Sequence, residues 1–160
     1  MGKYVVVSIS EMQLSDNRQD TIITYSLGSC IALVIYDPVK KQGGMIHLML
    51  PDSSIEKDKS KIVPCKFVDT GVPLLFRTLF KMGSHRNNIV VKVAGGSSVM
   101  DSTKYFNIGE RNYAAIRKML WRNNIMISSE DVGGSKSRTV KLFLESGKVV
   151  ISNSQEEYEI

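Results

Sequence analysis

Two nearly continuous apolar runs, Ile31–Tyr36 and Met45–Leu50, dominate the hydrophobic pattern of the chain. Runs of this kind, without polar alternation, are typical of strands that are covered on both faces. Asp37-Pro38 ends the first run and Gly43-Gly44 leads into the second, which is typical of a turn between two strands. The pattern therefore predicts a buried pair of strands joined as an antiparallel hairpin.

The rest of the chain divides into shorter strand-like and helix-like segments. Two segments carry an apolar face at helical spacing, Asp69–Met82 and Glu110–Asn123, and Gly83 is expected to end the first helix. Segments rich in β-branched residues predict strands at Tyr4–Ile9, Thr21–Tyr25, Ile89–Ala94, Ile125–Ser128, Thr139–Leu144 and Val149–Ser152. Polar composition predicts loops or a frayed end at Glu11–Asp20, at Ser53–Lys61 and from Gln155 onward.

These elements do not follow a regular strand–helix–strand alternation, which argues against a doubly wound parallel sheet. We expect an α/β fold in which mixed, largely antiparallel β-sheets pack as a sandwich with two or three helices. The length of 160 residues is that of one domain, which would cover residues 1–160.

Composition restricts the compartment and the class of partner. No apolar run approaches the roughly 20 residues of a membrane span, and the N-terminal residues do not resemble a signal peptide. We therefore expect a cytoplasmic protein without membrane insertion. The net charge is +5, but the basic residues form no stripe interleaved with aromatic residues, which argues against nucleic-acid binding. The turn at 95–98 lacks the phosphate-binding pattern, so we interpret it as a backbone turn.

The chain has two cysteines and two histidines, and one of each belongs to the region of the predicted hairpin. Cys30 follows a turn of small residues, which would expose its thiol, and His47 lies within the second apolar run. An imidazole that removes the proton of a thiol generates the nucleophile of a cysteine hydrolase. Apolar surroundings equally suit a buried structural cysteine and a structural histidine. The residues alone leave both interpretations open.

The other cysteine and histidine, Cys65 and His85, have no such neighbour in the sequence. The four residues lack the close spacing of a structural zinc site, so we expect no metal and no cofactor. Met100, Tyr105 and Phe106 lie in the loop before the second predicted helix. We interpret this loop either as packed on its own core or as a rim that docks a partner.

A series of motifs resembles the CheD family of chemoreceptor glutamine deamidases. The motifs are TYSLGSC at 24–30, YDP at 36–38, GGMIHLMLP at 43–51, VDT with Pro73 at 68–73, VAGG at 93–96, IGERN at 108–112, and DVGG through Arg138 at 131–138. They extend over nearly the whole chain in the order of the family. The sequence departs from the family at Ser26, where glycine is common. This departure bears on the shape of the turn before Cys30 and not on the chemistry.

The resemblance implies an enzyme that converts glutamine side chains on the cytoplasmic helices of chemoreceptors to glutamate and releases ammonia. In that reaction Cys30 is the nucleophile, His47 is the base, and Thr24 orients the imidazole ring. The oxyanion of the reaction requires fixed donors. The nearest in sequence belong to the turn before the nucleophile, at Ser26, Gly28 and Ser29.

The resemblance also implies a fold shared with cytotoxic-necrotizing-factor toxins and a CheC-type phosphatase as a binding partner. The alternative function is therefore a regulatory binding module with little catalysis. An unrelated thiol hydrolase that acts on small amides is a third hypothesis. Because attack on a glutamyl methyl ester needs the same thiolate, a methylesterase side activity is also expected.

The register of the hairpin predicts how the two candidate residues meet. A four-residue loop at 37–40 would place Tyr36 opposite Lys41 and Cys30 opposite His47. Opposed residues share one face of a sheet, so we expect the Cys30 sulfur within hydrogen-bonding distance to about 5 Å of a ring nitrogen. A bulge at Gly43-Gly44 would instead turn His47 to the other face.

Overall fold

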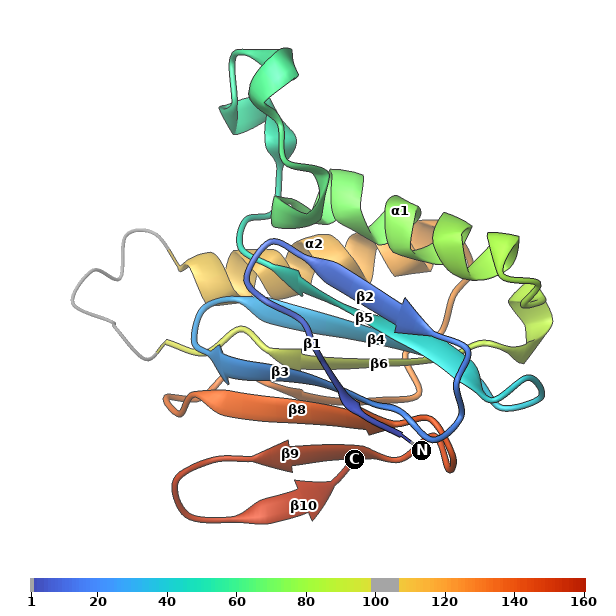
Figure 1. The fold of residues 1–160 in the computed structure, drawn as a ribbon. Helices are drawn as coiled ribbons and strands as arrows, with labels where there is room; N and C mark the ends of the chain where they lie inside the picture. The colour runs from blue at the N-terminus through green and yellow to red at the C-terminus, as the bar shows by residue number, and fades with distance from the viewer. Residues whose placement is uncertain (1, 99–106) are drawn as a thin grey trace.

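The computed structural model describes residues 2–98 and 107–160, which form three layers (Figure 1). Two helices cover one face of a five-stranded sheet, and a second five-stranded sheet packs against the other face. The helices of the described residues lack the length and the apolar character needed to span a bilayer.

Both sheets are mixed and largely antiparallel, as predicted. The middle sheet has the order β2 (Met12–Ser15), β5 (Gln42–Leu48), β4 (Ile31–Asp37), β6 (Val90–Gly95) and β7 (Ser129–Val132). The outer sheet has the order β1 (Tyr4–Val6), β3 (Thr21–Leu27), β8 (Arg138–Phe143), β9 (Val149–Ser152) and β10 (Glu157–Glu159). Only the β1–β3 and β6–β7 pairs of the described strands are parallel. The sandwich is therefore confirmed, whereas the likeness to the toxin fold and the single domain stay predictions.

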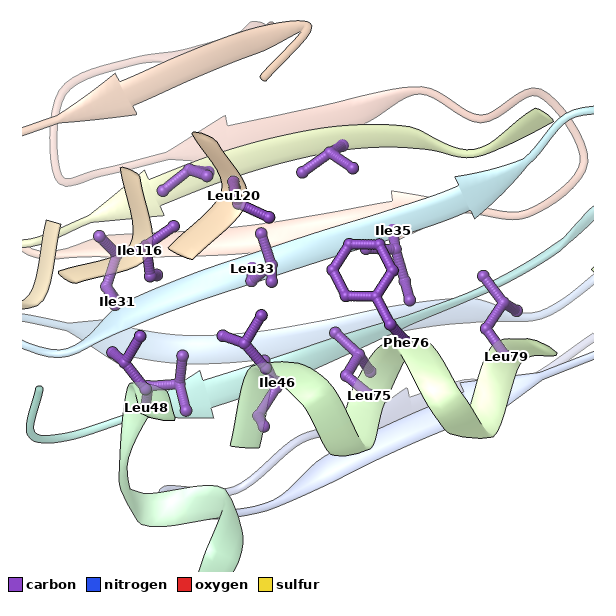
Figure 2. Close-up of a cluster of buried hydrophobic side chains, with 14 residues drawn as sticks. Ile31, Leu33, Ile35, Ile46, Leu48, Leu75, Phe76, Leu79, Ile116 and Leu120 are labelled. Carbon is purple, nitrogen blue, oxygen red and sulfur yellow. The ribbon is translucent and has the colours of Figure 1, made fainter. Parts of the chain in front are cut away.

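The two predicted helices are present as α1 (Val68–Lys81) and α2 (Ile108–Arg122). Gly83 follows the end of α1 with φ +99°, a conformation that glycine adopts without strain, as the sequence predicted. Each helix buries one apolar stripe against the middle sheet. Figure 2 shows Leu75, Phe76 and Leu79 of α1 and Ile116 and Leu120 of α2 against the strand residues Ile31, Leu33, Ile35, Ile46 and Leu48.

The central strands β4 and β5 are buried along their whole length because both faces of their sheet are covered. Their helix-side residues belong to the cluster of Figure 2. The residues between them in sequence, such as Ala32, Val34 and Met45, pack against the outer sheet. This two-sided burial explains why the sequence shows continuous apolar runs in these strands instead of alternation.

The hairpin register differs from the prediction. The four-residue loop is present but lies one position later, so that Asp37 pairs with Gln42 and Ala32, not Cys30, pairs with His47. A buried polar network accounts for the shift. Asp37 Oδ1 accepts hydrogen bonds from the N–H groups of Val39 and Lys40, and its Oδ2 accepts one from Ser84 Oγ at 2.6 Å. Gln42 Nε2 donates to the same Ser84 oxygen at 2.7 Å, which holds Asp37 and Gln42 together as the last pair of the ladder.

Three other segments differ from the sequence predictions. Met12–Ser15, within the predicted loop Glu11–Asp20, is strand β2, because Met12 and Leu14 pack on the helix-side cluster while the backbone pairs with β5. The predicted strand Ile125–Ser128 is not a strand. Ile125 and Ile127 pack on the same cluster, and the ladder with β6 begins only at Ser129.

The tail after Gln155 is not frayed throughout, because Glu157–Glu159 forms β10, paired antiparallel with β9. Tyr158 packs against the cluster between the sheets, and the Ile160 N–H donates to the Val149 carbonyl. Alternation of exposed glutamates with a half-buried tyrosine is the period-two pattern of an edge strand.

The network at Asp37 predicts a measurable contribution to stability. Ser84→Ala removes one partner from each of two buried polar side chains, so the free energy of unfolding should fall by about 1–3 kcal/mol. Urea denaturation of the variant and of wild type measures this difference. Ser146→Ala is the matched control, because its hydroxyl accepts a single exposed backbone hydrogen bond in another turn. Equal stability of the two variants would contradict the role of the network.

Candidate active site

His47 lies on β5 with its side chain 1% exposed and directed between the two sheets. Both edges of its backbone are paired. The His47 N–H donates to the Glu11 carbonyl, and the His47 carbonyl accepts from the Ser10 N–H, while Ala32 of β4 lies on the other side. The segment predicted as a polar loop thus fixes one side of the histidine backbone.

A hydrogen bond across the sandwich fixes the orientation of the ring. Thr24 Oγ1 lies on β3, in the outer sheet, 2.7 Å from His47 Nδ1 in the middle sheet. Thr24 is fully buried, and its hydroxyl also donates to the Val7 carbonyl at 2.7 Å. A hydroxyl has a single proton, so a threonine that donates to Val7 must accept from the ring. His47 therefore carries its proton on Nδ1 and presents a lone pair on Nε2.

The electrostatic environment keeps this ring neutral. Burial lowers the pKa of His47 from 6.5 to about 4, because the charged imidazolium would lose its hydration. Nε2 is buried and has no hydrogen-bond partner among residues 2–98 and 107–160. A buried acceptor of this kind costs free energy unless something binds to it. The histidine has the features of a base whose accepting nitrogen is available.

Cys30 lies one residue before β4, is half-buried, and packs against the cluster between the sheets. It shares that face with His47, as predicted, and the strands are neighbouring and antiparallel. The shifted register makes the two residues diagonal neighbours instead of opposed ones. Diagonal positions are about 7–8 Å apart between backbones. Among the described residues no hydrogen bond joins the Cys30 thiol to the His47 ring, so the predicted approach of sulfur to a ring nitrogen stays a prediction. Burial raises the pKa of the Cys30 thiol, and a hydrogen bond from its own backbone N–H partly opposes this.

The turn before Cys30 is held through its carbonyl groups. The Gly28 carbonyl accepts from both the N–H and the hydroxyl of Ser97, and the Cys30 carbonyl accepts from the Gly96 N–H at 2.8 Å. Asn112 Nδ2 donates to the Ser29 carbonyl at 3.0 Å. In the part of the chain that the structure describes, the N–H groups of Gly28 and Ser29 donate no hydrogen bond. These two N–H groups are the donors available to an anion at this turn.

Ser26 occupies an irregularity in β3 and is exposed. Its φ of +57° lies in the left-handed region, which glycine tolerates better than serine. The preference for glycine at this position, noted from the family resemblance, has a physical explanation here. The bulge between Thr24 and Leu27 lets β3 keep Thr24 inside while the chain turns toward Cys30.

The remaining candidates lie apart from this site. Cys65 packs on the helix-side cluster, and His85 is exposed. No group of three or more metal-ligating side chains occurs among the described residues. The loop residues Met100, Tyr105 and Phe106 lie outside the described residues.

A surface groove of the described residues lies elsewhere. It lies between α2 and the segment 125–130 and is lined by Arg117, Trp121 and Met126 among others, but by none of Thr24, Cys30 or His47. The candidate site is identified from its hydrogen bonds and its burial.

Three residues of the site had no assigned role in the sequence analysis: Val7, Ser97 and Asn112. Val7 acts through its backbone carbonyl, for which the sequence contains no signal. Ser97 belongs to the segment 95–98, in which Gly96 and Ser97 donate hydrogen bonds to carbonyl groups of the Cys30 turn. Asn112 belongs to the IGERN motif, which marked its position but not its contacts.

Comparison of the sequence with known proteins identifies the family to which the chain belongs. A family model described as CheD chemotactic sensory transduction matches residues 49–153. The probable chemoreceptor glutamine deamidase CheD 1 of Syntrophus aciditrophicus is 49% identical over 150 residues, which cover 94% of this chain and 94% of that protein. The probable chemoreceptor glutamine deamidase CheD 2 of Anaeromyxobacter dehalogenans is 43% identical, with 95% of this chain and 96% of that protein covered.

The chemoreceptor glutamine deamidase CheD of Thermotoga maritima is 41% identical over 146 residues, with 91% of this chain and 89% of that protein covered. The family-model match begins after His47, whereas the three relatives align over more than nine-tenths of the chain. The resemblance seen in the motifs is therefore confirmed over nearly the full length: the chain belongs to the CheD family.

Proposed function

We propose that this protein is a chemoreceptor glutamine deamidase in which Cys30 is the nucleophile and His47 the general base. The observation that carries the proposal is the hydrogen-bond chain from His47 through Thr24 to Val7. It leaves Nε2 as an acceptor on the same face of the sheet as the Cys30 thiol. The names of the relatives supply the substrate class, glutamine side chains of chemoreceptors.

The first chemical step transfers the thiol proton to Nε2 as sulfur attacks the carboxamide carbon. The raised pKa of Cys30 and the lowered pKa of His47 make both groups neutral at rest, so proton transfer accompanies attack instead of preceding it. The negative charge moves to the carboxamide oxygen. The N–H groups of Gly28 and Ser29, which donate no hydrogen bond to any described residue, are the proposed donors for that oxyanion.

The second step breaks the carbon–nitrogen bond. Imidazolium Nε2–H protonates the leaving nitrogen, ammonia departs, and a thioester to Cys30 remains. While the ring is charged, its Nδ1–H donates to Thr24, which donates to the Val7 carbonyl, so the positive charge faces a chain of oriented dipoles. Nε2 then removes a proton from water, which attacks the thioester and releases glutamate with the thiol restored.

Two further activities rest on the family resemblance. A glutamyl methyl ester presents the same acyl carbon with a better leaving group, so we propose methylesterase activity at the same thiol. A CheC-type phosphatase is the proposed protein partner, and a purely regulatory module bound to it is the alternative to catalysis. The cytoplasm stays the predicted compartment, because the proposed substrate helices belong to that side.

The nucleophile assignment predicts that Cys30→Ala abolishes deamidation of receptor cytoplasmic fragments without unfolding the protein. The measurement is mass spectrometry of the fragments, because each converted glutamine adds about 1 Da when NH2 is replaced by OH. Cys65→Ser is the matched control and should retain activity within a fewfold of wild type, because Cys65 packs on the other side of the middle sheet. Wild-type turnover by Cys30→Ala would refute the assignment.

The lowered pKa of His47 predicts how kcat/KM depends on pH on the acidic side of the pH profile. The base must be neutral, and a folded-state pKa of about 4 keeps it neutral well below the ordinary value of 6.5. We expect kcat/KM to change less than about twofold between pH ~7.5 and ~5, whereas a solvated histidine would lose about tenfold per pH unit below its pKa. Circular dichroism at each pH verifies that the enzyme remains folded. A decline centred near the ordinary histidine pKa would contradict the buried base.

A further inference from the structure

Asn112 makes the one side-chain bridge between the two strands at the site end of the hairpin, within the described part of the chain. It lies on α2, is 0% exposed, and its Nδ2 donates to the Ser29 carbonyl at 3.0 Å and to the Met49 carbonyl at 2.9 Å. Ser29 precedes Cys30, and Met49 follows His47 by two residues. One amide group thus connects the nucleophile turn to the strand of the base.

The bridge occurs where the backbone ladder stops. The last β4–β5 pair on this side is Ile31 with Leu48. Beyond it, the two hydrogens of the Asn112 amide satisfy two carbonyl groups that no longer face a strand partner. If the Asn112 amide were flipped, Oδ1 would face two carbonyl oxygens and could not form a hydrogen bond with either. The amide is therefore oriented with its NH2 group toward both carbonyls. Oδ1 is buried and has no partner among the described residues, which shows that the two donated bonds determine how the side chain is held.

Helix α2 packs so closely here that the short Asn112 side chain reaches the carbonyls of Ser29 and Met49. Gly109 lies one helical turn before Asn112 and faces the same way. A Cβ at Gly109 would lie 2.5 Å from the carbonyl carbon and oxygen of Gly96, a distance that real side chains do not adopt. Gly96 in turn donates its N–H to the Cys30 carbonyl. The absence of a side chain at Gly109 therefore lets the helix approach the backbone of Gly96, which is hydrogen-bonded to the Cys30 carbonyl.

We propose that Asn112 is a positioning residue that fixes the Cys30 turn at a set offset from the His47 strand. The proposal rests on the proposed function for the roles of Cys30 and His47. Asn112 has no exposed surface and so does not contact substrate. Its influence on the reaction comes only from the relative placement of the two reacting side chains.

Destabilisation of the hairpin is the competing explanation for any defect of an Asn112 variant. The far end of the same two strands provides a control, because Ser84 bridges Asp37 and Gln42 there in a buried network. Ser84→Ala weakens the same hairpin at a point remote along β4 and β5 from the Cys30 turn. A positioning effect belongs to Asn112 alone, whereas a stability effect would be shared by both variants.

The experiment compares Asn112→Ala with Ser84→Ala, each in a Cys65→Ser background so that Cys30 is the sole thiol. The pH dependence of Cys30 alkylation by iodoacetamide and the kcat and KM for receptor fragments are measured for both. In Asn112→Ala the freed thiol should be better solvated, so its alkylation midpoint moves to lower pH toward that of an ordinary cysteine. At the same time kcat should fall at least about tenfold with little change in KM. Faster alkylation combined with slower catalysis is the signature of lost positioning.

Ser84→Ala should keep the wild-type alkylation midpoint and kcat despite its lower stability. An Asn112→Ala variant with both quantities unchanged, or a Ser84→Ala variant that reproduces both changes, would overturn the proposal. If the alanine variant does not fold, Asn112→Gln carries the test, because it keeps the amide but displaces it by one methylene. It should shift the alkylation midpoint in the same direction, and an unchanged midpoint in it would overturn the proposal. The alkylation arm needs no substrate, so absence of deamidation in wild type would refute the proposed function while leaving the positioning test intact.

Discussion

The hydrogen-bond chain from the Val7 carbonyl through Thr24 to His47 is the interaction on which the proposed chemistry depends. It crosses the sandwich, because Thr24 and Val7 belong to the outer-sheet side and His47 to the middle sheet. A carbonyl can only accept, so it dictates the direction of both bonds and the position of the ring proton. The packing of two sheets thus determines which imidazole nitrogen can act as a base. In the proposed triad, a threonine takes the place that a carboxylate or an amide has in other triads.

The proposed mechanism requires the proposed nucleophile, Cys30, to be held in place as well as the proposed base, His47. The turn before Cys30 is held by Gly96 and Ser97, which directly follow β6, and by Asn112 of α2. All three act on carbonyl groups of the turn. Within residues 2–98 and 107–160 the N–H groups of Gly28 and Ser29 donate no hydrogen bond, so the turn is held through its carbonyls while these donors stay available to the proposed oxyanion. The hydrogen bonds from Gly96, Ser97 and Asn112 therefore support both the shape of the turn and its proposed part in the reaction.

Much of the fold follows from the sequence because its strongest signals are local. The apolar runs at Ile31–Tyr36 and Met45–Leu50 report two-sided burial, and Gly83 reports the end of a helix. The register of the β4–β5 hairpin could not be predicted from the sequence, because it depends on Ser84, which is 47 residues from Asp37 along the chain. A loop with Asp and Pro at its start suits either position, and only the tertiary contact distinguishes them.

The site shows the same division between local and distant information. Residue types and motifs identified Cys30, His47 and Thr24 as candidates, and the structure brings Thr24 and His47 into contact. The carbonyl of Val7 and the amide of Asn112 could not be predicted, since a backbone acceptor has no sequence signature and a buried asparagine is not distinguishable from an exposed one in the letters. Both act over long separations in sequence, which the hydrophobic pattern does not encode.

The protonation state of the His47 ring tests the central claim most directly. Nitrogen-15 NMR of the ring at neutral pH distinguishes a protonated from an unprotonated nitrogen, and exposed His85, the one other histidine of the sequence, serves as the internal reference. The hydrogen-bond chain predicts a protonated Nδ1 and an unprotonated Nε2 in His47, and loss of that preference in Thr24→Val, which keeps the shape of the side chain but removes the hydroxyl. A His47 ring that carries its proton on Nε2, or that is doubly protonated at neutral pH, would contradict the account.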